Sequence, residues 1–494
     1  MGIVQRQTLK NSIVNYLGII IGGLSTMFIY PLDWELYGEI QFSLSTAILL
    51  SAFFSLGSHS LANKYFPYFQ STNTKGFLSL MFIYSATNIV FISALLFIFR
   101  TSLSSVLELG GFDVDKITEN LFIIFPLGIL LVFIAILRAH SFNFGRIVYP
   151  DIISNFSLKI VVPAIILFSY LSLIDYTTSG WILVLYHVLI VIGLMLYIKS
   201  LGGLDFRTGV LRRVKKRKHA EMVRYMLYGA MNHVGNILVY KIDIVMIGLL
   251  LSSTKVGYYS IFLFLSVVIE IPIKAVVQIT GPIISKAFDE NRLDDIRKLY
   301  KSSSVNLYVI GIVLFSLIWL NIETFFTIMT NGEDLVIYKM VFLLLALTKL
   351  IEMITGVNFS IISYSKHFRV NTLFISILAI SNIILNYYFI TSFDILGAAL
   401  STSISMLVFN ILKTIFVAVK YKMHPFRWEL IILTLFLILA IFLPVFLPSV
   451  FKSILYSLFI SGIYSVVFIF VVYKLNISIE INNFINKYRS KIIK

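Results

Sequence analysis

The chain has 494 residues, of which 59% are hydrophobic and only 13% are charged, and its formal net charge is +16. Soluble globular domains are typically about 45–50% apolar and about one quarter charged, so this composition excludes an ordinary soluble protein and predicts a membrane protein. Cysteine is absent, which excludes disulfides, thiolate nucleophiles and cysteine-based metal sites.

Apolar runs long enough to cross a bilayer recur along the whole chain. They are continuously apolar and show no ten-residue alternation, which favours helices over a transmembrane β-barrel. The runs lie at about 11–31, 41–63, 77–100, 119–140, 150–171, 180–199, 223–250, 256–283, 302–320, 336–361, 368–390, 394–419, 429–449 and 451–473. We therefore expect an all-α membrane protein with about fourteen transmembrane helices.

The basic residues indicate how these helices are oriented. If the N-terminus is cytoplasmic, the connections on the inner side carry 31 Lys and Arg residues and those on the outer side carry 5. Such a bias is typical of cytoplasmic loops, and it predicts that both termini are cytoplasmic. The basic run 211–218 is then expected to lie against anionic lipid of the bilayer, and no nucleic-acid partner is expected.

The two halves of the chain show matching positions at an offset of 219 residues. Gly38 corresponds to Gly257, and Asp175 corresponds to Asp394. The repeat predicts two pseudo-symmetric six-helix bundles followed by a helix pair. The expected parts are an N-terminal bundle (1–200), a basic cytoplasmic linker (201–221), a C-terminal bundle (222–420), an extra helix pair (421–474) and an amphipathic cytoplasmic tail (475–494).

Charged residues inside the apolar runs are the candidate site. A charge in a membrane-spanning segment is costly unless it faces the protein interior or a wet cavity. The residues expected to line a substrate cavity are Lys159, Lys241, Asp243, Glu270, Lys274, Lys349 and Glu352.

Some of these charges can neutralise one another by helical spacing. Glu270 and Lys274 are four residues apart, and Lys349 and Glu352 are three apart, so both pairs can form within one helix. Lys159 has no acid within one helical turn. It is therefore the best single candidate for holding a substrate anion, and internal ion pairing remains the alternative for the others.

Three arginines lie at predicted cytoplasmic helix ends, where their guanidinium groups suit phosphate or anchor the topology. They are Arg138, Arg146 and Arg369. No glycine-rich phosphate loop, serine hydrolase motif or paired histidines at metal-ligand spacing occurs in the sequence. We expect no catalytic residue, no metal and no cofactor.

The stretch 243–285 contains the pattern Asp-x-x-x-Ile-Gly, then Val-Gly-Tyr-Tyr, then Pro-Ile-Ile-Ser. It resembles the start of the second half of Wzx-type polysaccharide flippases, which share a superfamily with the multidrug and toxin extruders (MATE) and the lipid II flippases. The resemblance implies a bacterial inner-membrane flippase that moves an undecaprenyl-pyrophosphate-linked oligosaccharide from the cytoplasmic to the outer leaflet by alternating access. It also implies contact with other membrane proteins of polysaccharide assembly.

Three alternatives remain open. A cation-coupled MATE exporter is weakened because 11–30 contains no acid, and a lipid II flippase is weakened because this first helix contains no arginine. A membrane glycosyltransferase or polymerase is disfavoured by the short outer loops and the missing motifs. The sequence leaves Na⁺, H⁺ and the membrane potential open as the energy source.

Overall fold

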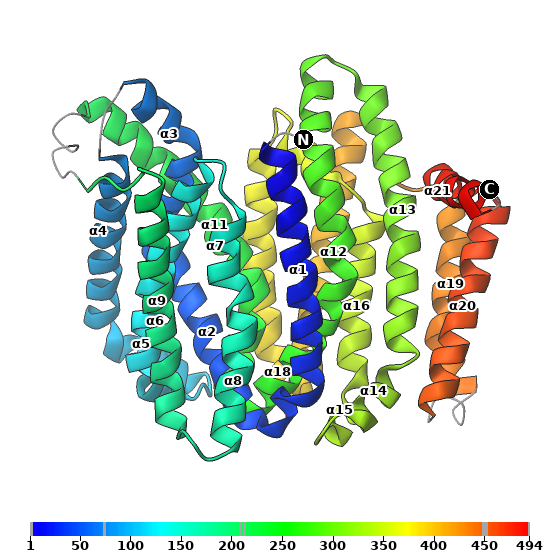
Figure 1. Cartoon of the computed structure of the whole chain (residues 1–494), viewed down its shortest axis with the longest axis horizontal. Helices are drawn as coiled ribbons and strands as arrows, with labels where there is room; N and C mark the ends of the chain where they lie inside the picture. The colour runs from blue at the N-terminus through cyan, green and yellow to red at the C-terminus, as the bar shows by residue number, and fades with distance from the viewer. Residues whose placement is uncertain (1–2, 73–75, 207–209, 211–213, 447–452, 493–494) are drawn as a thin grey trace. The chain divides into compact units, whose positions relative to one another are not determined.

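The computed structural model describes residues 3–72, 76–206, 210, 214–446 and 453–492, and these residues form helices and connections without a strand (Figure 1). Twelve helices of the described chain are long and apolar enough to cross a membrane. The helices are α1 (Ile3–Phe28), α2 (Trp34–Ser55), α3 (Leu61–Ser71), α4 (Phe77–Ile98), α5 (Arg100–Leu109), α6 (Val114–Phe142), α7 (Val148–Asp151), α8 (Leu158–Tyr170), α9 (Tyr176–Ser200), α11 (Lys216–Leu250), α12 (Ser253–Asp289), α13 (Leu293–Trp319), α14 (Ile322–Ile328), α15 (Glu333–Ile337), α16 (Lys339–Ile354), α17 (Asn358–Ser363), α18 (Arg369–Tyr421), α19 (Glu429–Phe446), α20 (Ile454–Lys474) and α21 (Ile479–Ile492). The predicted all-α membrane fold is confirmed.

Two features account for the difference between twelve long helices and fourteen predicted ones. Helix α18 is 53 residues long and contains non-helical backbone at Phe393 and Asp394, so it consists of two helical halves joined at a kink. Helix α16 has 16 residues and is flanked by the short helices α15 and α17, which together cover the predicted range 336–361. The predicted turn between the last two helices lies at 447–452, outside the described residues.

Two predicted spans are interrupted. The run 41–63 breaks after α2, where Leu56 and Gly57 have φ values of 38° and 77°, and a 3-10 turn, Ser58–Ser60, leads into α3. The run 150–171 contains a π-helical segment, Ile152–Phe156, between α7 and α8. Such π segments occur often at functional sites, and this one ends three residues before Lys159.

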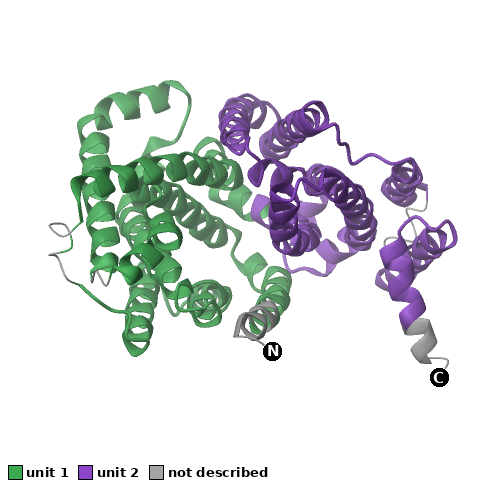
Figure 2. Cartoon of the chain, turned by 90° about the horizontal axis from the view of Figure 1, so that it is seen from above, with its two compact units in different colours: residues 1–258 green, residues 259–494 purple. Residues whose placement is uncertain are grey.

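Contacts divide the chain into two compact units, residues 1–258 and 259–494 (Figure 2). The division falls near the start of α12, whereas the sequence predicts a boundary at the linker 201–221. Residues 207–209 and 211–213 of that linker, including part of the basic run, lie outside the described residues. The five predicted functional parts stay a prediction.

Residues at matching positions of the two sequence repeats have corresponding structural roles. A Cβ atom on Gly257 would lie 2.8 Å from the Trp34 carbonyl oxygen, and one on Gly38 would overlap the Ser253 backbone. The two glycines therefore allow α2 and α12 to approach closely at their first turns. Asp175 begins α9 by accepting a hydrogen bond from the Thr178 N–H at 3.1 Å. Asp394 begins the second half of α18 by accepting from the Ile395 N–H at 2.7 Å.

Candidate functional site

A buried acid in unit 2 binds two lysines. Glu270 of α12 is 4% exposed, and its carboxylate forms ion pairs with Lys349 of α16 and with Lys274, one turn further along α12. The Lys274 Nζ lies 3.1 Å from Glu270 Oε1 and its side chain is 58% exposed, whereas Lys349 is 8% exposed. One carboxylate thus holds two cations, and this cluster has a net positive charge.

The arrangement confirms one sequence pairing and replaces the other. The pair of Glu270 and Lys274 forms as the spacing predicts. Lys349 instead reaches across to Glu270, and the Oε2 atom of Glu352 is buried without a hydrogen-bond partner in the described structure. Helical spacing reveals only neighbours on the same helix, so it could not identify an acid on a facing helix as the partner of Lys349.

The sequence did not single out Lys413, which is more deeply buried than any other cation among the described residues of unit 2. Its side chain, on the second half of α18, is 1% exposed. The Nζ atom lies 4.1 Å from the centre of the Phe409 ring and 5.8 Å from that of Phe359. Glu352 interacts with it electrostatically. The available signal was its place inside the predicted helix 394–419.

In unit 1, Lys159 of α8 is half-buried against α1. A Cβ atom on Gly18 would lie 3.0 Å from the Lys159 Nζ atom, so the missing side chain at Gly18 provides the space for this ammonium. Within the described residues, Lys159 forms neither a hydrogen bond nor an ion pair. Asp151, eight residues earlier, acts on it electrostatically. The expectation that Lys159 lacks an acid within one turn is met, although Asp151 attracts it from further away.

Asp151 is already bound by other groups. Its Oδ1 atom accepts hydrogen bonds from Arg138 at 2.8 Å and from Asn155 at 2.6 Å. The half-buried Arg138 is therefore part of an ion pair, and its contact with phosphate stays a prediction. Arg146 and Arg369 are exposed, and their contact with phosphate stays a prediction.

The remaining predicted site residues lie close together on α11. Asp243 is buried and has a polar or electrostatic contact, and Lys241 is half-buried. Residues two apart on a helix point in different directions, and a pairing of Lys241 with Asp243 stays a prediction.

A further buried acid, Glu39 of α2, is fully bound. It accepts hydrogen bonds from Asn120 at 2.6 Å and from Ser253 at 2.5 Å, and Lys116 Nζ lies 3.7 Å away. Glu39 precedes the predicted span 41–63 and was therefore missed as an intramembrane charge. Because its oxygens are occupied by donors, we interpret Glu39 as a structural acid near the close approach of α2 and α12.

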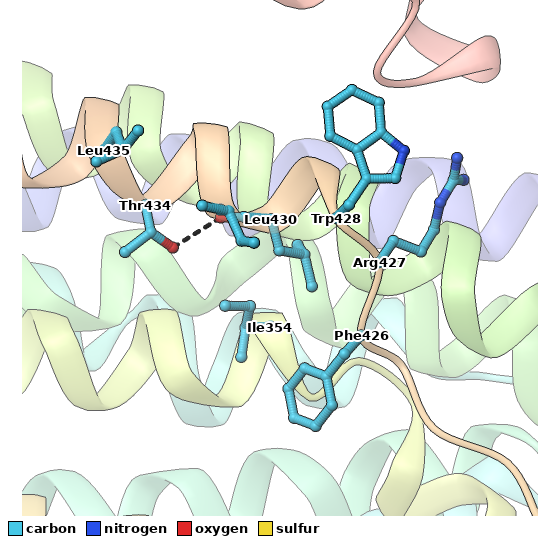
Figure 3. A pocket seen from close by; sticks show the side chains of 8 residues that line it. Ile354, Phe426, Arg427, Trp428, Leu430, Thr434 and Leu435 are labelled. Carbon is cyan, nitrogen blue, oxygen red and sulfur yellow. Dashed lines mark hydrogen bonds between the residues drawn. The ribbon is translucent and has the colours of Figure 1, made fainter.

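A cavity of about 550 Å³ lies beside the first turns of α19 (Figure 3). Its lining residues are Ile354, Phe426, Arg427, Trp428, Leu430, Ile431, Thr434 and Leu435. Arg427 is ion-paired with Glu429, and the Thr434 hydroxyl donates to the Leu430 carbonyl at 2.8 Å. With these polar groups engaged, the cavity presents an apolar surface that suits hydrocarbon and not a sugar.

Comparison with known protein families finds none that matches, and comparison with curated proteins finds no relative. Several solved structures are similar. The lipid II flippase MurJ in an inward closed conformation matches with a TM-score of 0.70 at 15% identity, over 94% of this chain and 99% of that chain. An inward-facing multidrug resistance MATE family transporter of the MOP superfamily matches with a TM-score of 0.59 at 12% identity, over 84% and 94%.

A third similar structure is a MOP superfamily transporter from Pyrococcus furiosus, for which a reverse polarity of the binding pocket suggests a different function. It matches with a TM-score of 0.53 at 13% identity, over 85% of this chain and 95% of that chain. At these identities the likeness concerns the fold. The chain has the all-helical, multi-pass membrane fold of MurJ and the MATE transporters.

Proposed function

We propose that this chain is a flippase of the Wzx type. It moves an undecaprenyl-pyrophosphate-linked oligosaccharide from the cytoplasmic to the outer leaflet by alternating access. The observation that carries the proposal is the surplus of positive charge inside membrane-spanning helices. In unit 2 the cations are Lys274, Lys349 and Lys413, and the acids are Glu270 and Glu352.

Lys159 in unit 1 adds to this surplus. A half-buried ammonium without a hydrogen bond or ion pair is costly inside a membrane, and a ligand phosphate is a natural partner for it. A pyrophosphate carries several negative charges and can engage more than one such cation. The lipid tail of the substrate stays in the bilayer, and the apolar cavity beside α19 is compatible with a hydrocarbon chain.

The fold supports transport of a lipid-linked molecule because one of the similar structures is a lipid II flippase. The fold alone equally suits a multidrug exporter, because another is a MATE transporter. The charge balance separates these alternatives: surplus buried lysines attract an anion and repel a cationic amphiphile. None of the similar structures that we describe supports the third alternative, a glycosyltransferase or polymerase.

The test is translocation in proteoliposomes. A fluorescent short-chain polyprenyl-pyrophosphate oligosaccharide is added on both sides, and an impermeant reducing agent bleaches the outer pool. We expect the purified chain to move the lipid of the inner pool to the outer leaflet, where the reagent bleaches it. A matched lipid in which a neutral group replaces pyrophosphate should stay protected. Movement of a cationic amphiphile without the pyrophosphate lipid would favour the exporter. Elongation or hydrolysis of the glycan without translocation would favour an enzyme.

We further propose that the chain lies in a bacterial inner membrane with both termini cytoplasmic, beside other proteins of polysaccharide assembly. Single cysteines in this cysteine-free chain test the orientation. Ser200 and Ser252 are exposed and suit labelling, whereas Ser253 is bound to Glu39. The proposal requires Ser252→Cys to react with an impermeant reagent on intact cells and Ser200→Cys to be protected. Labelling of both would contradict it.

A further inference from the structure

Lys413 combines deep burial with very few polar contacts. Its side chain is 1% exposed, and the described residues provide neither a hydrogen-bond acceptor nor an ion-pair partner for its three N–H donors. Among the described residues, the charge lies over the Phe409 ring at 4.1 Å and further from the Phe359 ring at 5.8 Å. A cation over an aromatic ring gains part of what it loses by leaving water. The charged form of Lys413 is therefore only partly stabilised.

The helices around Lys413 place it beside a matching acid. Three hydrogen bonds join α16 and α17 to α18, and in each the two residues are 55 or 56 positions apart in the sequence. They connect Thr348 with Ser403 at 2.9 Å, Thr355 with Asn410 at 3.0 Å and Asn358 with Thr414 at 3.3 Å. These bonds show that α16 runs parallel to the second half of α18. Contact with the Phe409 ring shows that the side chain of Lys413 folds back by one turn, as helical side chains do. Its Nζ thus approaches the level of Thr355, one turn from Glu352.

Glu352 is incompletely satisfied as well. Its Oε2 atom is buried without a hydrogen-bond partner, and such an atom costs free energy comparable to a lost hydrogen bond. The neighbouring elements contribute few other charges. Lys349, one turn earlier on α16, is bound to Glu270, Tyr300 of α13 lies beside Thr414, and α17 contributes the uncharged Asn358. A half-buried acid and a buried base thus lie near each other, and the described residues show no ion pair between them.

We propose that Lys413 is the proton-carrying site that couples transport to a proton gradient, with Glu352 as the acid that holds the proton there. This inference rests on the proposed function, because a transporter needs an energy source. In the release step one N–H bond of the ammonium breaks, its electron pair stays on nitrogen, and the proton passes to water. Loading is the reverse step. A buried lysine that loses its charge is a familiar device in proteins.

A proton fits this site better than a metal cation. The ammonium of Lys413 already supplies the positive charge beside Glu352, so a sodium ion bound there would be repelled. A neutral amine, in contrast, is far less costly to bury than an ammonium, and the Glu352 carboxylate that it leaves behind can turn to Lys349. The site therefore alternates between a charged and a neutral lysine.

The protonation state of Lys413 and Glu352 can influence the neighbouring cluster of Glu270, Lys274 and Lys349. When Lys413 is protonated, Glu352 is compensated and Lys349 stays on Glu270. When Lys413 releases its proton, Glu352 becomes an uncompensated anion three residues from Lys349, a spacing at which the two side chains can meet. Competition for Lys349 then weakens its bond to Glu270. In this way the protonation of Lys413 alters the positive cluster that we propose to attract the substrate anion.

The experiment compares imposed gradients in the proteoliposome assay, with the membrane potential clamped. We expect a pH gradient to accelerate wild-type translocation severalfold and a sodium gradient to have no effect. Lys413→Arg keeps the positive charge but cannot release a proton. It should fold and should move the lipid at one rate with or without the pH gradient. Lys413→Met should also be insensitive to the gradient, and the exposed control Lys366→Met should respond as the wild type does.

A gradient response retained by Lys413→Arg, or a wild type driven by sodium alone, would overturn the proton site. If the wild type moves no pyrophosphate lipid, the proposed function fails and a separate measurement decides the inference. Proton binding at Lys413 must make stability depend on pH. The difference in melting temperature between wild type and Lys413→Arg should then change as the pH is lowered from the ordinary lysine pKa of about 10.4. A constant difference would exclude titration at Lys413.

Discussion

The two units use intramembrane charge in different ways. In unit 2 the acid Glu270 is the shared centre, because two lysines bind it. In unit 1 the acid Asp151 is occupied by Arg138 and Asn155, and Lys159 is left without a direct partner. The contrast indicates that removal of Glu270 should mainly lower the stability of unit 2. Removal of Lys159 should mainly lower the transport activity of the protein.

The largest effect is expected at the centre of the unit 2 cluster. Glu270→Gln removes the carboxylate that compensates Lys349 and Lys274. Breaking a buried ion pair by removing one partner typically costs about 3–5 kcal/mol, so the melting temperature in detergent should fall strongly. Lys274→Met should cost much less, because that side chain is largely exposed.

Charge exchange gives a sharper version of the same test. Because Lys349 is the buried partner of Glu270, the double variant Glu270→Lys with Lys349→Glu should recover more stability than Glu270→Lys with Lys274→Glu. The second exchange leaves a lysine at position 270 facing Lys349. Equal recovery by both exchanges would show that Lys349 and Lys274 stabilise Glu270 equally. That result would contradict the larger contribution that we expect from the buried Lys349.

A functional effect without a stability effect is expected at Lys159. Lys159→Ala should reduce translocation of the pyrophosphate lipid at least tenfold, which is about 1.4 kcal/mol, with little change in melting temperature. Lys159→Arg should retain part of the activity, and added salt should weaken the attraction while the cavity is open to water. The exposed Lys366→Ala serves as the control. Normal translocation by Lys159→Ala, or failure of that variant to fold, would shift the anion site to Lys241 or Lys349.

A smaller effect on stability is expected when Asp151, the acid of unit 1, is neutralised than when Glu270 of unit 2 is. Asp151→Asn keeps the shape of the side chain and its contact with Asn155 but removes a negative charge near Lys159. We expect a modest loss of stability, because Arg138 is partly exposed to solvent, and an increase of severalfold in affinity for the pyrophosphate lipid. A loss of stability as large as that of Glu270→Gln would abolish the distinction between the units.

The smallest effect is expected at Asp175, the aspartate that the sequence repeat matches with Asp394. Asp175 is fully exposed, and its hydrogen bond with Thr178 lowers the pKa of its carboxyl group. A lowered pKa in the folded protein adds stability above the ordinary aspartate pKa of about 3.9 and loses it as the pH falls. Asp175→Asn, which keeps a capping side chain, should therefore lower stability slightly at neutral pH and not below about pH 3. An equal change at both pH values would exclude this charge effect.

Most of the fold could be predicted from the sequence because apolar length and basic loops are properties of short segments. The break between the runs 368–390 and 394–419 was predicted, and it lies at the kink of Phe393 and Asp394. The break from Leu56 to Ser60 was not predicted, because this polar segment is only five residues long and lies between apolar stretches. The site was predicted as a set of charges and not as a set of partners. Lys349 binds Glu270 on another helix, and Asp151 is taken by Arg138 from another helix, which periodicity along one helix cannot reveal.

The most direct test of the central claim is the identity of the lipid that the protein retains. Native mass spectrometry of the chain, purified gently from cells that make a surface polysaccharide, should detect a bound pyrophosphate-linked glycan lipid. The same species should be lost from Lys159→Ala and kept by Lys366→Ala. A wild type that retains a cationic amphiphile instead, or a Lys159→Ala variant that binds the glycan lipid as the wild type does, would contradict this account.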